Sequence, residues 1–256
     1  MTKISVAMAT FNEKENIGES IKSVRQLADE IVVVDGSSID KTRKIAKRLG
    51  AKVIKTTNKP MFHINKNMAI DACQGEWILV LDADERVTSE LGEEMKKIAA
   101  KKWNKNEPAG YWLKRKNYFL SRFLKKGGQY PDPVIRFFKK NKGRHPEVSV
   151  HEQIEIAGKL GWLKNDLIHL ASPTFARYLT RENRYSTLEA QGMVKRGIKI
   201  NLSNSIKYLL IKPPATFLSL FIRHKGYQDG FPGFVFALFS GIHHFLSYFK
   251  YWEMKK

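Results

Sequence analysis

The chain has 256 residues, 43% of them hydrophobic, so it is long enough to bury one substantial α/β core with an appendage and is not intrinsically disordered. Its 45 Lys and Arg residues outnumber its 25 Asp and Glu residues. The resulting formal charge of +20 favours a polyanionic partner such as nucleic acid, an anionic membrane or a phosphorylated substrate. The single cysteine, Cys73, excludes an internal disulfide and any cysteine-built metal site, and it fits a reducing compartment.

The first residues indicate a β-strand and not a secretory signal. The sequence becomes polar at Asn12 and Glu13, before a long apolar segment can form. We therefore expect a protein that begins and stays in the cytoplasm.

Strand and helix patterns then alternate over about ninety residues. Short apolar runs predict strands, and apolar side chains at helical spacing predict the helices between them. This alternation is typical of an α/β fold with a mostly parallel, doubly wound sheet. The predicted strands are residues 4–8, 31–35, 51–55 and 77–81, and the predicted helices are residues 15–27, 42–49 and 65–73.

From residue 107 to about residue 170 the pattern becomes shorter and more aromatic. We predict strands over residues 111–113, 134–138 and 148–156, separated by clusters of Gly, Pro and Lys. A charged helical segment follows Pro173.

Polar clusters follow three of the predicted strands at the point where each ends. Residues 10–13 follow the first strand, residues 35–40 follow the second, and residues 82–85 follow the fourth. Open α/β sheets bind ligands beyond the carboxyl ends of their strands, near the switch point in strand order. The three clusters should therefore converge on one crevice.

Asp82 and Asp84 are candidate metal ligands. They flank Ala83 directly after a buried apolar strand, with Glu85 beside them. A hard cation such as Mg²⁺ or Mn²⁺ takes carboxylate oxygens and completes its shell with substrate phosphates, where it acts as a Lewis acid on a departing diphosphate. Taken alone, the same pattern is more often a cap on the next helix.

Together the three clusters resemble the hallmarks of the inverting GT-A glycosyltransferases of family 2. That family carries a Thr-x-Asn-Glu loop, an Asp-Gly-Ser-Ser-x-Asp-x-Thr loop and an Asp-x-Asp motif. This chain matches them at residues 9–13, 33–42 and 82–84. The resemblance covers at least residues 1–90 and implies a GT-A fold that binds a nucleotide diphosphate sugar.

The resemblance also implies roles for individual residues. Asp35 would accept a hydrogen bond from the uracil ring, Asp82 would face the ribose or the metal, and Asp84 would bind the metal directly. Lys66 and Arg136 would suit the diphosphate; the alternatives are a solvated helix charge and a structural ion pair. The donor-binding residues in this interpretation are Thr10, Phe11, Asn12, Glu13, Asp35, Lys66, Asn67, Asp82, Ala83, Asp84 and Arg136.

The second half of the chain supplies a further metal ligand and a general base. A histidine after the central strands often completes the metal shell in related GT-A enzymes, so His151 joins Asp82 and Asp84 as a candidate ligand. Inversion needs a carboxylate facing the acceptor hydroxyl, and Asp132 and Glu152 both qualify. His169 lies in an apolar run, and we expect it to serve the core.

Residues 206–249 combine aromatic and aliphatic runs with scattered basic residues. A proline pair at 213–214, a stretch at 226–233 and a histidine pair at 243–244 interrupt the runs, so none is a clean span of about twenty residues. Helices lying in a membrane interface fit this pattern, with about 1 kcal/mol from each basic residue near anionic lipid. The alternative is a helical subdomain packed on the core or on a dimer partner.

The stretches 212–234 and 250–253 also resemble the tail of a narrower branch, which includes lipopolysaccharide core glycosyltransferases similar to the inner-core β-1,4-glucosyltransferase. With it, the match covers nearly the whole chain. We expect a GT-A catalytic domain over residues 1–170, with a nucleotide-sugar-binding half (1–100) and an acceptor-side half (101–170), and a helical extension over residues 171–256.

These patterns predict an inverting, Mn²⁺- or Mg²⁺-dependent hexosyltransferase. It would transfer a sugar from a UDP-sugar to a membrane glycolipid such as lipopolysaccharide core. The resemblance implies that this sugar is glucose. We expect it to lie on an anionic membrane surface, as a peripheral protein at the cytoplasmic face of the inner membrane. The alternatives are a polyprenyl-phosphate or protein glycosyltransferase and, in a different class, a nucleic-acid-binding protein, although no nucleic-acid-binding motif is found and no such partner is expected.

Overall fold

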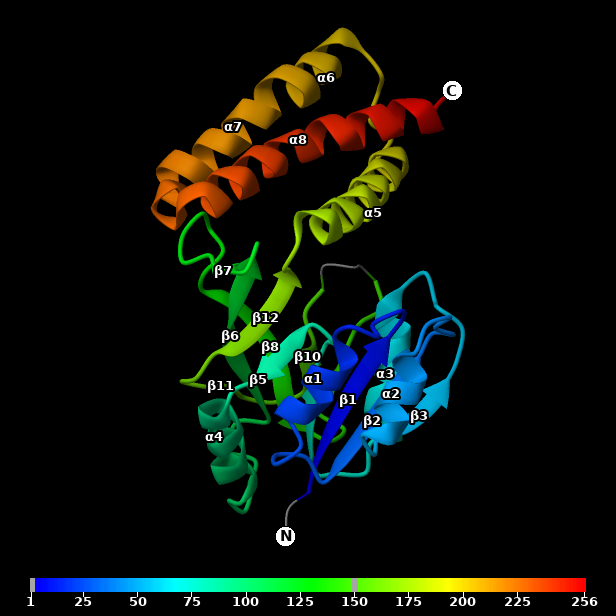
Figure 1. Cartoon of the computed structure of the whole chain (residues 1–256), viewed down its shortest axis with the longest axis vertical. Coiled ribbons are helices and arrows are strands. Elements are labelled where there is room, and N and C mark those ends of the chain that lie inside the picture. The colour runs from blue at the N-terminus through cyan, green and yellow to red at the C-terminus, as the bar shows by residue number, and fades with distance from the viewer. Residues whose placement is uncertain (1–2, 149–151) are drawn as a thin grey trace. The chain divides into compact units, whose positions relative to one another are not determined.

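The computed structural model describes residues 3–148 and 152–256, and its internal contacts divide the chain into two units (Figure 1). One is built around a β-sheet and is called the sheet unit below. The other consists mainly of helices and is called the helical unit. The sheet unit comprises the described residues of Met1–Arg115 and Asp132–His169, and the helical unit comprises Lys116–Pro131 and Leu170–Lys256.

A mixed, mostly parallel sheet forms the centre of the sheet unit. Its first four strands are all parallel, in the spatial order β3-β2-β1-β4. β8 joins β4 in the antiparallel direction, and the sheet continues through β6, β12 and β5. The strands are β1 (Ile4–Thr10), β2 (Glu30–Asp35), β3 (Lys52–Lys55), β4 (Trp77–Val80), β5 (Glu85–Val87), β6 (Gly110–Phe119), β7 (Arg122–Phe123), β8 (Asp132–Lys139), β9 (Gly143–Arg144), β10 (Glu155–Ile156), β11 (Leu160–Trp162) and β12 (Leu167–Ser172).

Helices cover both faces of the parallel strands. α1, α2 and α4 pack against one face, which includes Val6, Met8 and Val33, whereas α3 packs against the other face, which includes Ala7 and Val32. Successive side chains of a strand point to opposite faces, so strands that are apolar throughout are stable only when both faces are covered. The helices of this unit are α1 (Ile17–Ser23), α2 (Thr42–Arg48), α3 (Phe62–Ala72) and α4 (Ser89–Ala99).

The strand order reverses at β1, so the switch point of the sheet lies at the carboxyl ends of β1 and β4. β2 and β3 follow β1 on one side of the sheet, and the chain then crosses to form β4 on the other side of β1. Thr10, the last residue of β1, pairs in register with Asp35, the last residue of β2. On the other side of β1, the Leu81 N–H donates to the Ala7 carbonyl. The three polar clusters predicted to meet therefore lie along the same edge, where such sheets bind ligands.

The strands and helices predicted for the first ninety residues are confirmed, with differences at their ends. The strand predicted over residues 148–156 is wrong, because in its described part only Glu155–Ile156 is strand. Glu147 adopts a left-handed backbone with φ 63°, and the Glu152 carboxylate accepts hydrogen bonds from the N–H groups of Glu147 and Val148. Among the described residues, Glu147 and Val148 are therefore bound to the Glu152 side chain and make no strand pairing.

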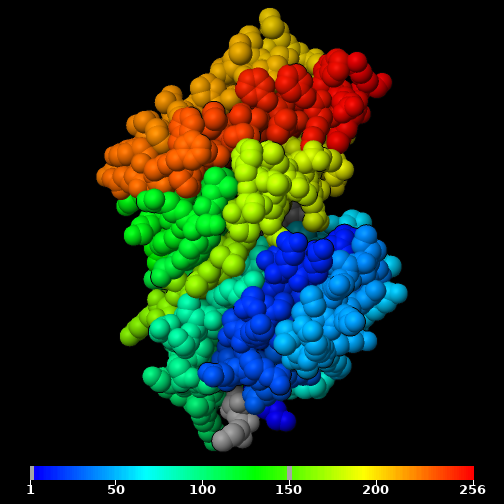
Figure 2. Space-filling model, in the orientation of Figure 1, coloured from blue at the N-terminus to red at the C-terminus, as the bar shows by residue number. Residues whose placement is uncertain are grey.

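The helical unit is organised around its longest helix, α8, which packs on both α5 and α7; these helices form the yellow-green to red surface in Figure 2. Tyr208, Tyr248 and Tyr251 are buried together and form part of its core. The helices are α5 (Phe175–Lys195), α6 (Leu202–Ile206), the π-helical η1 (Lys207–Ile211), α7 (Lys212–Leu218), the π-helical η2 (Ser219–Arg223), the 3₁₀ helix η3 (Gly226–Asp229) and α8 (Gly230–Met254).

Two of the residue pairs that interrupt the apolar runs of the tail lie within helices. Pro213 and Pro214 begin α7, directly after the wider turn of η1, and a proline in the first turn of a helix leaves no intrahelical bond unmade. The histidine pair lies inside α8. There His244 hydrogen-bonds Thr216, and so links α8 to α7. Across the described residues, no helix is both long enough and apolar enough to be a candidate membrane span.

Candidate active site

Two of the motif loops are bound to each other by hydrogen bonds. The Asn12 N–H donates to Ser38 Oγ (2.8 Å), the Ile39 N–H donates to Asn12 Oδ1 (2.9 Å), and the Glu13 N–H donates to Thr42 Oγ1 (2.8 Å). Asn12 adopts φ 55°, a left-handed conformation that asparagine tolerates better than most residues. The loops after β1 and β2 therefore form one continuous rim, which explains why both motifs need short polar side chains.

Asp35 is completely buried beneath this rim. Its carboxylate accepts hydrogen bonds from the Ser38 N–H (2.9 Å) and Ser38 Oγ (2.5 Å), and Thr10 Oγ1 lies 3.3 Å from Oδ2. The Arg43 guanidinium lies 3.5 Å from Oδ1. Phe11 is partly exposed, whereas Thr10 is buried. The carboxylate is thus fixed in one orientation by its own loop.

Asp35 and Asp82 lie at the same edge of the sheet, with one strand between them. Asp35 ends β2, Asp82 follows β4, and β1 pairs with both of these strands. Two strand spacings correspond to about 10 Å. This separation is compatible with one nucleotide diphosphate that contacts both ends.

Asp82 is held between two buried cations. Its Oδ1 lies 2.5 Å from Lys66 Nζ, and its Oδ2 lies 2.6 Å from an Arg136 guanidinium nitrogen. Burial opposes ionisation of Asp82, but Arg136 and Lys66 outweigh it and hold its pKa well below the usual value. Burial likewise lowers the pKa of Lys66, and Asp82 counteracts that effect. Despite its burial, the pKa of Arg136 is raised by Asp82 and by Glu85.

The ion-pair network continues to one of the candidate bases. Glu85 is completely buried and lies 2.9 Å from Arg136 and 3.5 Å from Arg115. Arg115 also donates from two guanidinium nitrogens to Asp132 Oδ2, at 2.7 and 3.0 Å. β6 and β8 place Arg115 directly opposite Asp132 in the antiparallel register. A chain of alternating charges thus runs from Lys66 to Asp132.

Asp84 faces a histidine that the sequence assigns to the core. Its Oδ2 lies 3.6 Å from His169 Nε2, and both side chains are partly exposed. β5 and β12 pair His169 with Glu85, which brings this ring to the strand end. Ala83 is buried, and its carbonyl accepts a hydrogen bond from the Arg86 guanidinium. The expectation that His169 serves only the core is therefore corrected by its contact with Asp84.

Asn67 and Glu152 lie elsewhere in the sheet unit and contact the loop that follows β9. The Asn67 amide donates to the His145 carbonyl (2.9 Å) and to Glu147 Oε1 (2.5 Å), and its Oδ1 accepts the His145 N–H (3.0 Å). Glu152 Oε1 lies 3.0 Å from His63 Nδ1. The predicted metal ligand His151 lies outside the described residues.

The arrangement offers positive charge to a polyanionic ligand at the switch point. Lys66 and Arg136 come from α3 and β8 and converge on Asp82, where hydrogen bonds to charged partners are short and strong. A bound diphosphate can accept hydrogen bonds from the same two cations. The carboxylate Asp84, with His169, supplies oxygen and nitrogen donors beside them.

Sequence reasoning missed several residues of this site. Glu85 was recognised only as a neighbour of the metal motif, and Arg115 was not singled out at all. Arg115 stands in a run of three basic residues directly after the predicted strand 111–113, but its role depends on its register with Asp132 across the sheet, which local sequence does not encode. His63 and His145 were missed because the contacts of His63 with His145 and Glu152 join parts of the chain that are far apart in the sequence.

The chain is similar to known glycosyltransferases over nearly its whole length. Residues 5–158 match the model of glycosyl transferase family 2. An uncharacterized glycosyltransferase of Rickettsia felis is 32% identical over 98% of this chain and 89% of its own length. The lipopolysaccharide core biosynthesis glycosyltransferase LpsC of Rhizobium meliloti is 27% identical over 98% of this chain and 92% of its own length.

Solved structures give more distant similarities. S. aureus TarS (residues 1–349) aligns with 97% of this chain and 89% of its own, with 16% identity and a TM-score of 0.45. The glucosyl-3-phosphoglycerate synthase of Mycobacterium tuberculosis, in complex with Mn²⁺ and UDP-glucose, aligns with 46% of this chain and 44% of its own, with 20% identity and a TM-score of 0.37.

Proposed function

Because this chain belongs to glycosyl transferase family 2, we propose that it transfers a sugar from a UDP-sugar to a lipid-linked saccharide acceptor. Its mostly parallel sheet with helices on both faces is the GT-A-like fold expected from the sequence. In this proposal the sugar is glucose, the anomeric carbon inverts, and the acceptor is a membrane glycolipid such as lipopolysaccharide core. The end-to-end similarity to LpsC supports the acceptor class.

One observation carries the proposal: Lys66 and Arg136 converge on Asp82 at the switch point of the sheet. Asp35, the proposed uracil contact, lies about 10 Å away across β1. A UDP molecule placed along this edge would have its base near Asp35 and its phosphates near the two cations. Fixed positive charges stabilise the negative charge that develops on a leaving diphosphate.

Asp84 and His169 fit a divalent metal ion by the chemistry of their donor atoms. A carboxylate oxygen and an imidazole nitrogen suit Mn²⁺, and two ligand atoms on one such ion lie about 3 Å apart, close to the observed 3.6 Å. When bound, the ion would act as a Lewis acid on the leaving diphosphate. Asp84 is the proposed direct ligand. Asp82 faces the metal or the ribose in the same proposal, although its two oxygens pair with Lys66 and Arg136 in this structure.

Asp132 is the proposed general base. Its side chain is 31% exposed, whereas that of Glu152 is only 8% exposed. The Glu152 oxygens also accept two backbone N–H groups and contact His63. A base must come within hydrogen-bond reach of the acceptor hydroxyl, so the more accessible carboxylate is the better candidate.

Exposed apolar side chains in the helical unit support a membrane surface as the place of action. Ile211, Leu218 and Ile222 are more than half exposed and recur at intervals of seven and four residues, the spacing of one helix face. Lys207 and Arg223 are exposed on the same helical run. An apolar helix face with basic residues is typical of proteins that lie in the headgroup region of anionic membranes.

The donor site is tested by UDP binding. The wild-type chain should bind UDP more tightly with Mn²⁺ than without it in calorimetric titrations. Asp84→Ala should weaken the Mn²⁺-dependent binding by at least about tenfold, as expected when a metal ligand is lost. Asp71→Ala, which removes an exposed carboxylate paired with Arg144, is the matched control and should leave UDP binding unchanged. Unchanged Mn²⁺-dependent binding in Asp84→Ala would overturn the assignment.

The acceptor is tested by labelled sugar transfer. The purified chain is incubated with Mn²⁺, membranes and radiolabelled UDP-glucose, and the products are separated into lipopolysaccharide, simpler lipid and protein. Label in lipopolysaccharide supports the proposal. Label in a polyprenyl-phosphate lipid or in protein would favour one of the alternative acceptors.

A further inference from the structure

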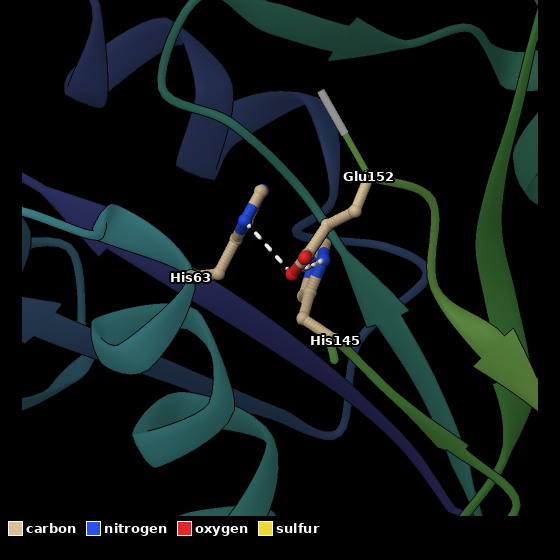
Figure 3. A group of neighbouring side chains, drawn as sticks. All are labelled: His63, His145 and Glu152. Atoms are coloured by element: carbon tan, nitrogen blue, oxygen red, sulfur yellow. Dashed lines mark ion pairs between the residues drawn. The ribbon is translucent and has the colours of Figure 1, made fainter. Parts of the chain in front are cut away.

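We propose that the sheet unit holds a transition-metal ion between His63, His145 and Glu152, at a site that shares no ligand with the proposed Asp84 centre. The expected ligand is Zn²⁺ or a similar divalent transition-metal cation. The three side chains come from α3, from the loop after β9 and from the segment before β10, and they point toward one another (Figure 3).

The donor atoms of the three side chains lie close enough for one ion. One ligand atom from each residue lies within 4.8 Å of the other two. Glu152 Oε1 is 3.0 Å from His63 Nδ1 and 3.9 Å from His145 Nδ1, so the carboxylate oxygen lies close to both rings. The rings stack with a centroid separation of 4.2 Å and an interplanar angle of 13°. Small side-chain rotations would bring all three donors to one point.

The environment of the His145 side chain indicates that it binds a ligand. It is only 4% exposed, and neither of its ring nitrogens makes a hydrogen bond to the described residues. Buried polar nitrogens without a partner destabilise a folded protein, so they usually have a ligand or a hydrogen-bond partner.

The surroundings hold the ligands in place, as the outer shell of a metal site does. Asn67 accepts the His145 N–H and donates to the His145 carbonyl, which fixes the backbone of this ligand. Glu152 accepts the N–H groups of Glu147 and Val148, which orients its carboxylate. Outer contacts of this kind are a regular feature of protein metal sites.

The ligand types select the class of metal. Two imidazoles and one carboxylate suit Zn²⁺ and neighbouring transition metals, whereas Mg²⁺ and Ca²⁺ prefer oxygen ligands alone. An ion here would connect α3 to the loop after β9. His63 lies three residues before Lys66 on α3, so both side chains lie on one face of that helix. The ion would thereby fix the helical turn that presents Lys66 to Asp82.

The test is metal binding by the full chain without nucleotide. After removal of metals with a chelator and dialysis, the chain is titrated with Zn²⁺ by calorimetry and with Co²⁺ by visible absorption. We expect one Zn²⁺ per chain and Co²⁺ absorption that Zn²⁺ abolishes. His145→Gln and Glu152→Gln should each weaken Zn²⁺ binding by about 100-fold or more, since each removes a direct ligand. His224→Gln, which removes an exposed histidine of the helical unit, should have no effect.

The outcomes separate this site from the proposed donor site. Asp84→Ala should keep its Zn²⁺ affinity while losing Mn²⁺-dependent UDP binding. Loss of both would place the Zn²⁺ at the donor site and overturn the proposal. A wild-type chain that binds no Zn²⁺ and gives no Co²⁺ absorption would also overturn it, whatever the variants do. Circular dichroism of each metal-free variant identifies any that fails to fold, and His63→Gln then takes its place.

Discussion

The residues around Asp82 form an arrangement in which each buried charge has a partner of opposite sign. Lys66 and Arg136 neutralise Asp82, Arg136 and Arg115 share Glu85, and Arg115 continues to Asp132 (2.7 Å). Removing one member of such a buried network leaves its partner uncompensated, which costs several kcal/mol. Isosteric changes that preserve hydrogen bonds are therefore the most informative substitutions here.

The substitution Asp132→Asn tests whether Asp132 is the general base. Asparagine keeps an oxygen that can accept from Arg115 but cannot take a proton from the acceptor hydroxyl. We expect kcat to fall by about 10²–10⁴-fold, while the Kd for UDP with Mn²⁺ stays close to the wild-type value. Asp71→Asn is the matched control and should turn over normally. A kcat within a factor of about three of wild type would exclude Asp132 as the base.

Single residues also show what the sequence could predict about the site. The strand-end motifs located Asp35, Asp82 and Asp84 because each follows an apolar run within a few residues. The partners of these acids could not be found in this way. Arg115 reaches Asp132 only through the antiparallel register of β6 and β8, and His169 reaches Asp84 through the pairing of β12 with β5.

At the scale of elements, prediction succeeded where one local pattern decides the structure. Three of the four parallel strands, β1, β2 and β4, are mostly apolar, and their burial on both faces follows from that composition. Prediction failed over residues 148–156. An alternation of apolar residues there indicates a strand, but the Glu152 carboxylate accepts hydrogen bonds from the N–H groups of Glu147 and Val148. The proline pair at 213–214 interrupts an apolar run, as expected, but it lies in the first turn of α7 directly after the π-helical η1, and the helix continues.

The packing of α7 against α8 depends on a glycine. A Cβ at Gly241 would lie 2.7 Å from the Pro213 carbonyl oxygen, a backbone atom that cannot move alone. We expect Gly241→Ala to destabilise the chain by about 1–3 kcal/mol through overpacking. Gly192→Ala on α5 is the control. Its Cβ would meet only the flexible Arg196 side chain, and the substitution should stabilise the chain by up to about 1 kcal/mol.

Urea unfolding followed by circular dichroism measures both glycine variants. Equal stability of Gly241→Ala and wild type would show that α7 and α8 are further apart than described. A destabilised Gly192→Ala would instead mean that the helix propensity argument fails in this unit.

For the molecule as a whole, the net charge of +20 indicates a polyanionic partner. Charge alone does not distinguish a nucleic acid from an anionic membrane. The proposed function favours a membrane, because exposed basic residues and exposed apolar residues occur on the same helical run. The sequence composition shows that basic and apolar residues are both present in this part of the chain. Which side chains stay exposed depends on how α8 packs against α5 and α7, and composition does not contain that information.

Vesicle sedimentation tests the proposed membrane association. The chain should bind anionic vesicles more tightly than zwitterionic ones, and added salt should weaken the binding. Replacing Lys207 and Arg223 by Glu should weaken binding to anionic vesicles by about tenfold or more, at about 1 kcal/mol for each basic residue. The matched control replaces Lys97 and Lys101, two exposed lysines of the sheet unit, and changes the net charge equally.

An equal loss in the two double variants would mean that net charge alone attracts the chain, and the proposed surface would then be wrong. Equal binding to both kinds of vesicle would contradict an electrostatic contribution altogether.

The pairing of Asp82 with Lys66 and Arg136 has a consequence for turnover. In the proposed function, an incoming diphosphate and Asp82 would bind the same two cations, so Asp82 would compete with the nucleotide. Such competition would weaken the binding of donor and product alike, and Asp82 would pair with the cations again when UDP departs. Weaker binding of UDP would favour its faster release, and product release limits the turnover of many enzymes.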